Sequence, residues 1–433
     1  MTDAADEYVI EGGHVLTPDF EVREADVLID RAAGEVLAVD DDLDAPETVD
    51  ATDSLVMPGL VNAHTHVAMT LLRGYADDKP LDAWLQEDIW PVEAELTPED
   101  IRVGTELGLV EFIKSGITGF ADAYFAVGEI AAATADAGLR ANLSHSFITV
   151  GKDDEAARAD AEESLAVARE FDGAADGRIT TALMPHSLTT AGGEYIEAVL
   201  DDAREAEIPV HYHANETENE VDPIVDEHGV RPLEYAADRG ILTDDDFLAH
   251  CVHVDETEIE LLAETGASVI HCPASNMKLA SGIAPVQEML DAGVNVGLGT
   301  DGAASNNDLD LFDEIRDAAM LGKLARCDAR DVAAESAVRM ATAGSASAIG
   351  LPVGRLEAGG TADIAVVDFD APHLTPVHDH VSHLAYAVRG SDVRHTICDG
   401  EVLMEDREVT TLDEAAIRER ASEAAADLVA RAE

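Results

Sequence analysis

Two hydrophobic patterns alternate along the middle of the chain. Between about residues 57 and 350, short apolar runs are separated by stretches such as 160–171, 194–207 and 257–265, in which apolar residues recur at helical spacing. Eight of the short runs end in polar residues: His64-Thr-His66, Gly119-Phe-Ala-Asp122, Ser144-His145, Met184-Pro-His186, His211-Tyr-His213, Ala249-His250, Val269-Ile-His271 and Gly299-Thr-Asp301.

This order of elements predicts an α/β fold. Eight strand–helix units in series are typical of a (β/α)₈ TIM barrel, which we expect over residues 57–350. A doubly wound sheet is the alternative, but the Gly-x-Gly-x-x-Gly turn that usually follows its first strand is absent. Barrel enzymes keep their chemistry at the carboxyl ends of the strands, where the polar residues gather here.

The two ends of the chain have the texture of short antiparallel strands. Residues 7–56 alternate apolar and polar positions around glycines, and the pattern resumes at 361–368 and 396–403, with Asp399-Gly400 as a hairpin turn. Neither piece is long enough for a core of its own, so we expect residues 1–56 and 351–433 to pair into one small β-domain. Residues 412–432 predict an amphipathic surface helix.

The charge of the chain is extreme. Its 433 residues include 90 Asp and Glu against 27 Lys and Arg, a formal net charge of -63. Such a surface repels phosphate backbones and anionic lipids, so we expect no nucleic-acid or membrane partner. Self-repulsion needs screening by salt, which favours a salt-rich cytosol over the alternative of a mesophilic protein with an acidic coat.

The cysteines and the N-terminus indicate the cellular compartment of the protein. The four cysteines have no Cys-x-x-Cys spacing, so neither a disulfide framework nor a structural zinc knot is indicated. The N-terminus lacks the basic and apolar regions of a signal peptide, and no apolar run reaches membrane-spanning length. We expect a cytoplasmic protein.

The polar strand ends contain a candidate metal site. His64 and His66 are two residues apart on a strand and therefore project to the same side. His213 and Asp301, at two other strand ends, add a third imidazole and a carboxylate, a ligand set typical of catalytic zinc, with Glu216 and His250 beside it. Three further histidines have other interpretations: we expect His211 to pack or hydrogen-bond, His253 to lie beyond the site and His271 to be a core histidine.

Five motifs together resemble the amidohydrolase superfamily, specifically its methylthioadenosine and S-adenosylhomocysteine deaminase branch, beside the triazine hydrolases and guanine deaminases. The resemblance runs from about residue 8 to 405. The motifs are Pro58-Gly-Leu-Val-Asn-Ala-His64-Thr-His66, His213-x-x-Glu216, Ala249-His250-Cys-Val-His, His271-Cys-Pro-Ala-Ser-Asn and Gly299-Thr-Asp301-Gly-Ala-Ala-Ser-Asn-Asn.

The resemblance implies a barrel with a composite β-sandwich domain from both chain ends, and a homo-oligomer. It also implies one zinc ion per subunit, with Fe, Mn or Ni as alternatives, bound by His64, His66, His213 and Asp301. Binuclear members use a carboxylated lysine on strand four, and residues 178–186 contain no Lys, so one metal is the consistent count.

The same resemblance implies a hydrolytic deamination in which the adenine C6 amino group is replaced by oxygen and ammonia is released. Asp301 would take a proton from the attacking water and pass it to the leaving amine, and Glu216 would protonate the ring nitrogen. His250 would hydrogen-bond the nucleophile. Glu93 and His186 would bind the nucleoside, the former through its ribose hydroxyls, and Trp84 would wall the pocket.

One position departs from the family pattern. Where an arginine suited to a substrate carboxylate is frequent, this chain has His145, which would grip a carboxylate less well, although Arg158 could compensate. We therefore favour methylthioadenosine, deoxyadenosine or adenosine over S-adenosylhomocysteine. The alternatives are a guanine or aminotriazine deaminase or chlorohydrolase, and an inactive metal-binding scaffold.

Overall fold

The computed structural model describes residues 6–432. Residues 1–5, which we assigned to the small β-domain and to the N-terminus without a signal peptide, lie outside the described residues. Seven of the eight predicted strand ends overlap observed strands in the middle of the chain, and the eighth, residues 299–301, directly follows the last of them. These strands are β8 (Leu60–Thr65), β9 (Ile117–Tyr124), β10 (Arg140–Phe147), β11 (Ile179–Thr181) with β12 (Met184–Pro185), β13 (His211–Ala214), β14 (Phe247–His250), β15 (Ser268–His271) and β16 (Val296–Leu298).

The middle strands are parallel and follow chain order. One sheet has the order β11-β10-β9-β8, with β12 also paired to β10, and a second has the order β13-β14-β15-β16. Isolated bridges at Leu183–Val210 and Ser187–His213 join the first sheet to the second. The main-chain N–H of Asp301, just after β16, donates to the His64 carbonyl of β8 at 3.0 Å. All carboxyl ends therefore meet at one face.

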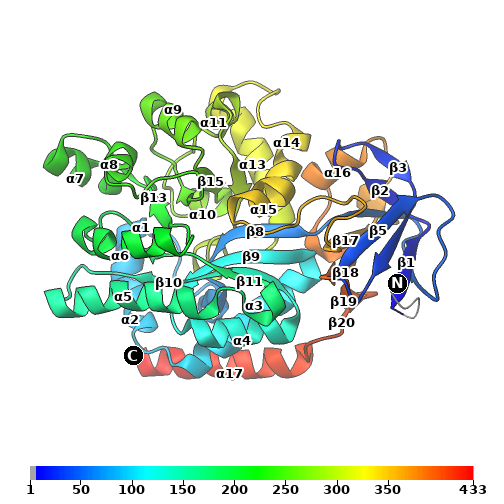
Figure 1. Cartoon of the computed structure of the whole chain (residues 1–433), viewed down its shortest axis with the longest axis horizontal. Helices are drawn as coiled ribbons and strands as arrows, with labels where there is room; N and C mark the ends of the chain where they lie inside the picture. Colours follow the sequence, from blue (N-terminus) through cyan, green and yellow to red (C-terminus); the bar gives the residue numbers. More distant parts are fainter. Residues whose placement is uncertain (1–5, 433) are drawn as a thin grey trace.

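Helices follow the strands and cover them, as Figure 1 shows. Helix α3 illustrates the local code: Thr97 and Asp100 form a reciprocal capping box at its start, and Pro98 occupies the first turn. The longer helices are α3 (Pro98–Ser115), α4 (Val127–Ala137), α5 (Asp154–Phe171), α6 (Gly193–Glu205), α7 (Glu218–His228), α9 (Glu256–Thr265), α13 (Leu311–Arg326) and α17 (Glu414–Ala432).

Short helices lie mainly in the connections at the carboxyl face and near the end of the parallel region. They are α1 (Leu81–Trp84), α2 (Trp90–Glu93), α8 (Pro232–Asp238), α10 (Pro273–Lys278), α11 (Val286–Ala292), α12 (Ala303–Asn306), α14 (Ala334–Arg339), α15 (Ser345–Ala348) and α16 (His380–Tyr386).

Two further sheets lie at one end of the molecule (Figure 1). The first has the order β5-β4-β1-β6, and the second β20-β19-β18-β17-β7-β2-β3. In the second, β7 from the start of the chain pairs antiparallel with β17 from its end. The strands are β1 (Glu7–Glu11), β2 (His14–Leu16), β3 (Val22–Glu24), β4 (Asp26–Asp30), β5 (Glu35–Asp40), β6 (Glu47–Asp50), β7 (Ser54–Pro58), β17 (Ile364–Asp368), β18 (Val393–Cys398), β19 (Glu401–Glu405) and β20 (Glu408–Val409).

Both of these sheets contribute to one apolar cluster, which includes Ile10 and Ile29 from the first sheet and Val56 and Val366 from the second. The predicted pairing of the two chain ends is therefore present as strand pairing. The predicted C-terminal helix is α17, whose Arg420 pairs with Glu106 of α3 at 2.6 Å.

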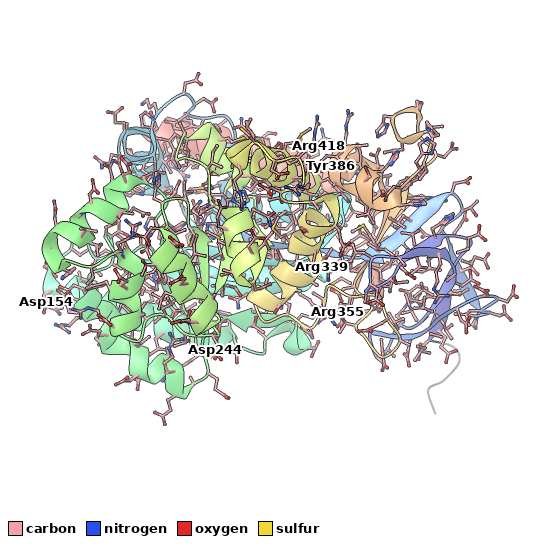
Figure 2. The ribbon with its side chains drawn as sticks, turned by 90° about the horizontal axis from the view of Figure 1, so that it is seen from above. Asp154, Asp244, Arg339, Arg355, Tyr386 and Arg418 are labelled. Atoms are coloured by element: carbon pink, nitrogen blue, oxygen red, sulfur yellow. The ribbon has the colours of Figure 1, made fainter. Side chains whose placement is uncertain are left out.

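The surface carries the acidic excess. Asp154 and Asp244, labelled in Figure 2, are exposed residues of the helical region. Within the described residues, none of the helices has the length and apolar character needed to span a bilayer.

Candidate metal centre and active site

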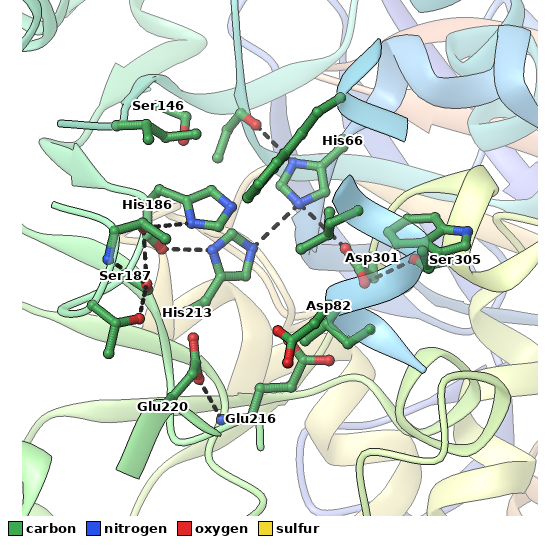
Figure 3. Close-up of a pocket in the computed structure, with 18 of the residues that line it drawn as sticks. His66, Asp82, Ser146, His186, Ser187, His213, Glu216, Glu220, Asp301 and Ser305 are labelled. Atoms are coloured by element: carbon green, nitrogen blue, oxygen red, sulfur yellow. Dashed lines mark hydrogen bonds and ion pairs between the residues drawn. The ribbon is translucent and has the colours of Figure 1, made fainter. Parts of the chain in front are cut away.

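Four side chains predicted as metal ligands converge at the carboxyl face. Three of them, His66, His213 and Asp301, are labelled in Figure 3. The Nε2 atom of His66 lies 3.2 Å from Oδ1 of Asp301, and the Nε2 atom of His64 lies 3.6 Å from the same oxygen. The Nε2 atoms of His213 and His66 are 3.3 Å apart. The Nε2 atoms of three imidazoles and the Oδ1 atom of one carboxylate therefore face one small space.

The outer nitrogens of two of these histidines are held by main-chain carbonyls. The Nδ1–H of His66 donates to the Ala123 carbonyl at 2.7 Å, and the Nδ1–H of His213 donates to the His186 carbonyl at 2.7 Å. Because Nδ1 carries the proton in each neutral ring, Nε2 is left with a lone pair directed at the centre.

His64 is fixed by a longer hydrogen-bonded chain. The Nδ1–H of His211 donates to the Phe247 carbonyl at 2.8 Å, which leaves the Nε2 atom of His211 to accept from Nδ1 of His64, also at 2.8 Å. His211 thus hydrogen-bonds and does not reach the centre with a free nitrogen, in line with its predicted role. The fully buried Nε2 atom of His64 has no hydrogen-bond partner within residues 6–432.

An unpartnered buried imidazole nitrogen facing two more imidazoles and a carboxylate fits a divalent cation. Burial lowers the pKa of His64 to about 4, so this ring is neutral at physiological pH. Burial acts the same way on His66, but Asp301 outweighs it and raises the pKa of His66 to about 9.

Asp301 is held in one orientation. Its Oδ2 atom accepts hydrogen bonds from the hydroxyls of Ser275 at 2.7 Å and Ser305 at 2.8 Å, so Oδ1 is the atom that faces the histidines. A Cβ atom on Gly299 would lie 2.7 Å from the His64 carbonyl oxygen, so only glycine allows the end of β16 to approach β8 this closely. Asp301 itself has φ 59°, a strained conformation of the kind found at functional sites.

Glu216 and His250 lie beside the four ligands. The Glu216 carboxyl is buried, and burial is the main reason that its pKa is raised. Its Oε1 atom accepts from the Ser281 hydroxyl at 2.9 Å, and its Oε2 atom lies 3.7 Å from Nε2 of His250. The Nδ1–H of His250 donates to Oδ1 of Asn276 at 2.9 Å. Glu216 is therefore a buried acid suited to holding a proton near the cluster.

A cavity of about 300 Å³ opens beside this cluster. Three of the predicted substrate-pocket residues line it: Glu93, His186 and Trp84. Oε1 of Glu93 accepts from the Tyr124 hydroxyl at 2.5 Å, and Nδ1 of His186 lies 2.8 Å from the Thr190 hydroxyl. The cavity therefore combines apolar walls with a few fixed polar groups, as small-molecule sites do.

Two predicted contributors to substrate binding are not among the residues that line the cavity. His145 bonds to Asp160 at 3.3 Å, and Arg158 pairs with Asp154 at 3.3 Å on the surface of α5. Arg158 is thus engaged elsewhere and does not supply the cation that we considered as compensation for His145.

The structure also adds residues that the sequence did not single out. Glu220 lines the cavity, and its Oε2 atom accepts from the main-chain N–H of Glu216 at 2.7 Å. Asp82 lines the cavity too and accepts from the Asn219 amide at 2.5 Å. The i, i+4 spacing of Glu216 and Glu220 was a usable signal, although in a chain with 90 acidic residues such a spacing is common by chance.

Comparison with known families gives a match over most of this chain. The model of the Amidohydrolase family matches residues 55–403. The chain belongs to the amidohydrolase family. This match spans all four candidate ligands, and the resemblance predicted from the motifs is confirmed.

Similar proteins of this family have names that refer to adenosine derivatives. The chain is 69% identical over 423 residues, 98% of each sequence, to a 5-methylthioadenosine/S-adenosylhomocysteine deaminase of Halobacterium salinarum. It is 45% identical, over 98% of each sequence, to a 5'-deoxyadenosine deaminase of Methanosarcina mazei. A crystal structure of an adenosine deaminase from Xanthomonas campestris with bound zinc matches with a TM-score of 0.92 and 37% identity over 98% of each chain.

Proposed function

We propose that this amidohydrolase is a hydrolytic deaminase that replaces the C6 amino group of an adenosine-type nucleoside with oxygen and releases ammonia. One observation carries the proposal: a buried Glu216, whose pKa is raised by burial, stands beside the His64, His66, His213 and Asp301 cluster at the wall of a cavity of about 300 Å³. Hydrolysis of an amidine C–N bond needs an acid for the ring nitrogen and an activated water, and this cluster offers both.

The cation in this proposal is one zinc ion per subunit, with Fe, Mn or Ni as alternatives. His64, His66, His213 and Asp301 would hold it, and their three nitrogens and one oxygen suit zinc. When bound, the ion supplies the positive charge that lowers the pKa of water to roughly 7. Metal analysis of protein purified without added metal, read as one equivalent per chain, tests this assignment.

The side chains around the cation divide the proton transfers. Asp301 would accept one proton from the attacking water and deliver it to the amine as the C6–N bond breaks, and the remaining proton of the attacking oxygen would return to Glu216 as the C6 carbonyl forms. Glu216, whose burial raises its pKa, donates its proton to the ring nitrogen next to C6, which makes that carbon electrophilic. His250 stands 3.7 Å from Glu216 and hydrogen-bonds the attacking oxygen, which stabilises the developing charge.

The cavity supports a nucleoside with a small or uncharged group at the 5′ carbon. Glu93, held by Tyr124, would accept hydrogen bonds from the ribose hydroxyls, and His186, which lines the same cavity, would contact the same ligand. Among the described residues that line the cavity there is no Lys or Arg, whereas Asp82, Glu93, Glu216, Glu220 and Asp301 are all acidic. A substrate carboxylate would have no cation to bind, so methylthioadenosine, deoxyadenosine and adenosine are favoured over S-adenosylhomocysteine.

The alternative activity within the family is deamination of guanine or dechlorination and deamination of an aminotriazine. Such small rings would leave the Glu93 and Tyr124 pair without a ribose to bind. An inactive metal-binding scaffold is disfavoured, because each ligand and each proton-handling group that the family pattern implies is present in this chain.

Ammonia release from a panel of compounds at molar KCl tests the proposal. Methylthioadenosine, 5′-deoxyadenosine and adenosine should be turned over, S-adenosylhomocysteine more slowly, and guanine and aminotriazines not at all. Turnover of guanine or an aminotriazine in preference to every nucleoside would replace this function with the alternative one.

We also propose how the strands, the small sheets and the subunits are arranged. The hydrogen bonds between β8 and the residues after β16 support closure of the eight strands into a barrel over residues 57–350. The shared apolar cluster supports a composite β-sandwich of residues 1–56 and 351–433. We also propose a homo-oligomer that works in a salt-rich cytoplasm, where ions screen the net charge of -63. Unfolding followed as KCl is removed tests the salt dependence, and full stability in dilute buffer would disprove it.

A further inference from the structure

One ten-residue segment, 272–281, contacts Asp301, His250 and Glu216, the three side chains to which the proposed mechanism gives a role at the reacting atoms. It follows β15, includes the short helix α10 and runs along the carboxyl face of the parallel strands. We propose that this segment is the positioning element of the active site, and that Ser275, Asn276 and Ser281 set the orientations of Asp301, His250 and Glu216. The inference rests on the proposed function, because it assigns a purpose to residues around the proposed catalytic groups.

Asn276 carries the strongest part of the argument. Its side chain is fully buried, and Oδ1 accepts from Nδ1 of His250 at 2.9 Å. This bond fixes the His250 ring so that Nε2 is turned toward Glu216, 3.7 Å away. The Nδ2 group of Asn276 has no hydrogen-bond partner among residues 6–432. A buried amide that satisfies only its oxygen is costly for stability, which indicates a role beyond packing.

The two serines act on the two carboxyl groups. The Ser275 hydroxyl donates to Oδ2 of Asp301 at 2.7 Å, which leaves Oδ1 for the histidine cluster. The Ser281 hydroxyl donates to Oε1 of Glu216 at 2.9 Å, which leaves Oε2 on the side of His250. Each serine therefore selects which carboxyl oxygen faces the reaction and which faces the protein.

The segment is itself anchored at both ends. Near its start, the main-chain N–H of Ala274 donates to the buried carboxyl of Glu314 on α13 at 3.2 Å. At its end, Nε2 of His253 donates to the Ser281 carbonyl at 2.7 Å. The next residue, Gly282, has φ 139°, and a Cβ there would lie 2.7 Å from a Val252 methyl, so glycine is required for this approach. His253, which we expected beyond the site, thus holds the segment in place.

The arrangement has a testable consequence for kinetics. A segment that only stabilises the fold would affect the amount of folded protein and leave the turnover of each folded molecule unchanged. A positioning segment affects kcat, because misplacing a reacting group by about 1 Å costs roughly 10²-fold in rate. Since none of the three residues is proposed to bind substrate, KM should change little.

The test compares three variants of the full-length, metal-loaded protein. Asn276→Leu removes the acceptor at similar volume, Asn276→Asp keeps an acceptor oxygen at the same place, and Asn142→Leu makes the same exchange at a buried asparagine of β10 that does not line the cavity. We expect Asn276→Leu to lower kcat about 10²-fold with KM within about threefold, Asn276→Asp to recover at least about tenfold of that loss, and Asn142→Leu to keep the parent kcat.

A readout that does not depend on turnover accompanies the kinetics. In protein labelled with ¹⁵N-histidine, the Nδ1–H signal of His250 should be protected from exchange in the parent and in Asn276→Asp, and lost in Asn276→Leu, at equal metal content. A parent that deaminates no nucleoside would end the proposed function, while this signal would still report on the positioning bond. A parental kcat for Asn276→Leu, or an unchanged Nδ1–H signal in that variant, would overturn the inference.

Discussion

The two ends of the parallel strands both bury charged groups, but they treat them differently. At the amino end, Nε of Arg140 lies 3.1 Å from both oxygens of Asp363, and its Nη2 atom lies 2.6 Å from Asp399. At the carboxyl end, the Nε2 atom of buried His64 has no hydrogen-bond partner within the described residues. One end neutralises its charges internally, and the other leaves ligand atoms free.

This difference indicates that the amino end serves the stability of the fold and that the carboxyl end serves the reaction. Burial alone would lower the pKa of Arg140, but Asp363 outweighs burial and raises it, so the ion pair is permanent and joins β10 to the small sheets. The carboxyl end instead contains backbone strain, with φ 73° at His250 and 59° at Asp301. Substitutions at the amino end should therefore lower the stability of the fold, and substitutions at the carboxyl end should lower the enzymatic activity.

The largest effect is expected at the ligand cluster. His213→Ala removes one of three imidazoles, so bound metal should fall below one equivalent and turnover should fall to background. Metal analysis and ammonia release check this result, with His378→Ala, an exposed histidine, as the matched control. Removing the metal from the parent with a chelator should have the same effect, and added Zn²⁺ should reverse it. Full turnover in the metal-free protein would contradict the assignment.

The next largest effect concerns the proposed acid. Glu216→Gln keeps the shape and the bond to Ser281 but has no proton to donate, so kcat should fall about 10³-fold while the metal content stays the same. Glu218→Gln, two residues away and exposed, is the control and should keep the parent rate. A Glu216→Gln protein that deaminates at the parental rate would show that another group supplies the proton.

A substitution at the amino end of the strands should lower the stability of the fold. Arg140→Met keeps the apolar stem but leaves Asp363 buried without its partner, so the free energy of unfolding should fall by about 3–5 kcal/mol. The kcat of the folded fraction should not change. Denaturant unfolding at fixed KCl measures the loss, and Arg158→Met, which breaks an exposed Arg–Asp pair, should leave the stability almost unchanged. Equal losses in the two variants would remove the distinction between the two ends.

The fourth expected effect is a pH dependence of stability that comes from Glu220 at the cavity wall. Burial, followed by the neighbouring Glu216, raises the pKa of Glu220 to about 8, above its ordinary value of 4.5. Between these values the folded protein binds a proton that the unfolded chain does not, so this group makes stability fall as pH rises, by at most about 1.4 kcal/mol per pH unit. Above pH 8 this stabilising contribution is lost.

Glu220→Gln cannot ionise and should therefore flatten the stability profile between pH 5 and pH 8. Unfolding curves across that range at constant KCl test this, with exposed Glu227→Gln as the comparison. An unchanged slope in Glu220→Gln would mean that Glu220 does not retain its proton in the folded protein.

The strand ends and the four candidate ligands could be located from the sequence because their signals are local. An apolar run that ends in His64-Thr-His66 is visible within ten residues, and the alternation of strands and helices places His213 and Asp301 on the same face. The structure brings these four side chains together, and their role as ligands stays a proposal that the metal analysis tests.

The positioning residues could not be predicted in the same way. Serine and asparagine are common on surfaces, and nothing near Asn276 or Ser281 in the sequence indicates that their partners are His250 and Glu216. The Arg140–Asp363 pair joins residues 223 positions apart, and an ion pair of that separation has no periodic signature. Such contacts depend on the packed geometry of the strands.

The pairing of β7 with β17 has a consequence for how the chain is made. Residues 54–58 leave the ribosome some 300 residues before their partner strand at 364–368. Until then, one edge of a strand that is buried in the finished protein is exposed, and unpaired apolar edges promote aggregation. A nascent chain arrested before residue 364 should therefore depend on chaperones, and a C-terminal truncation should be insoluble even though every candidate ligand is present in it.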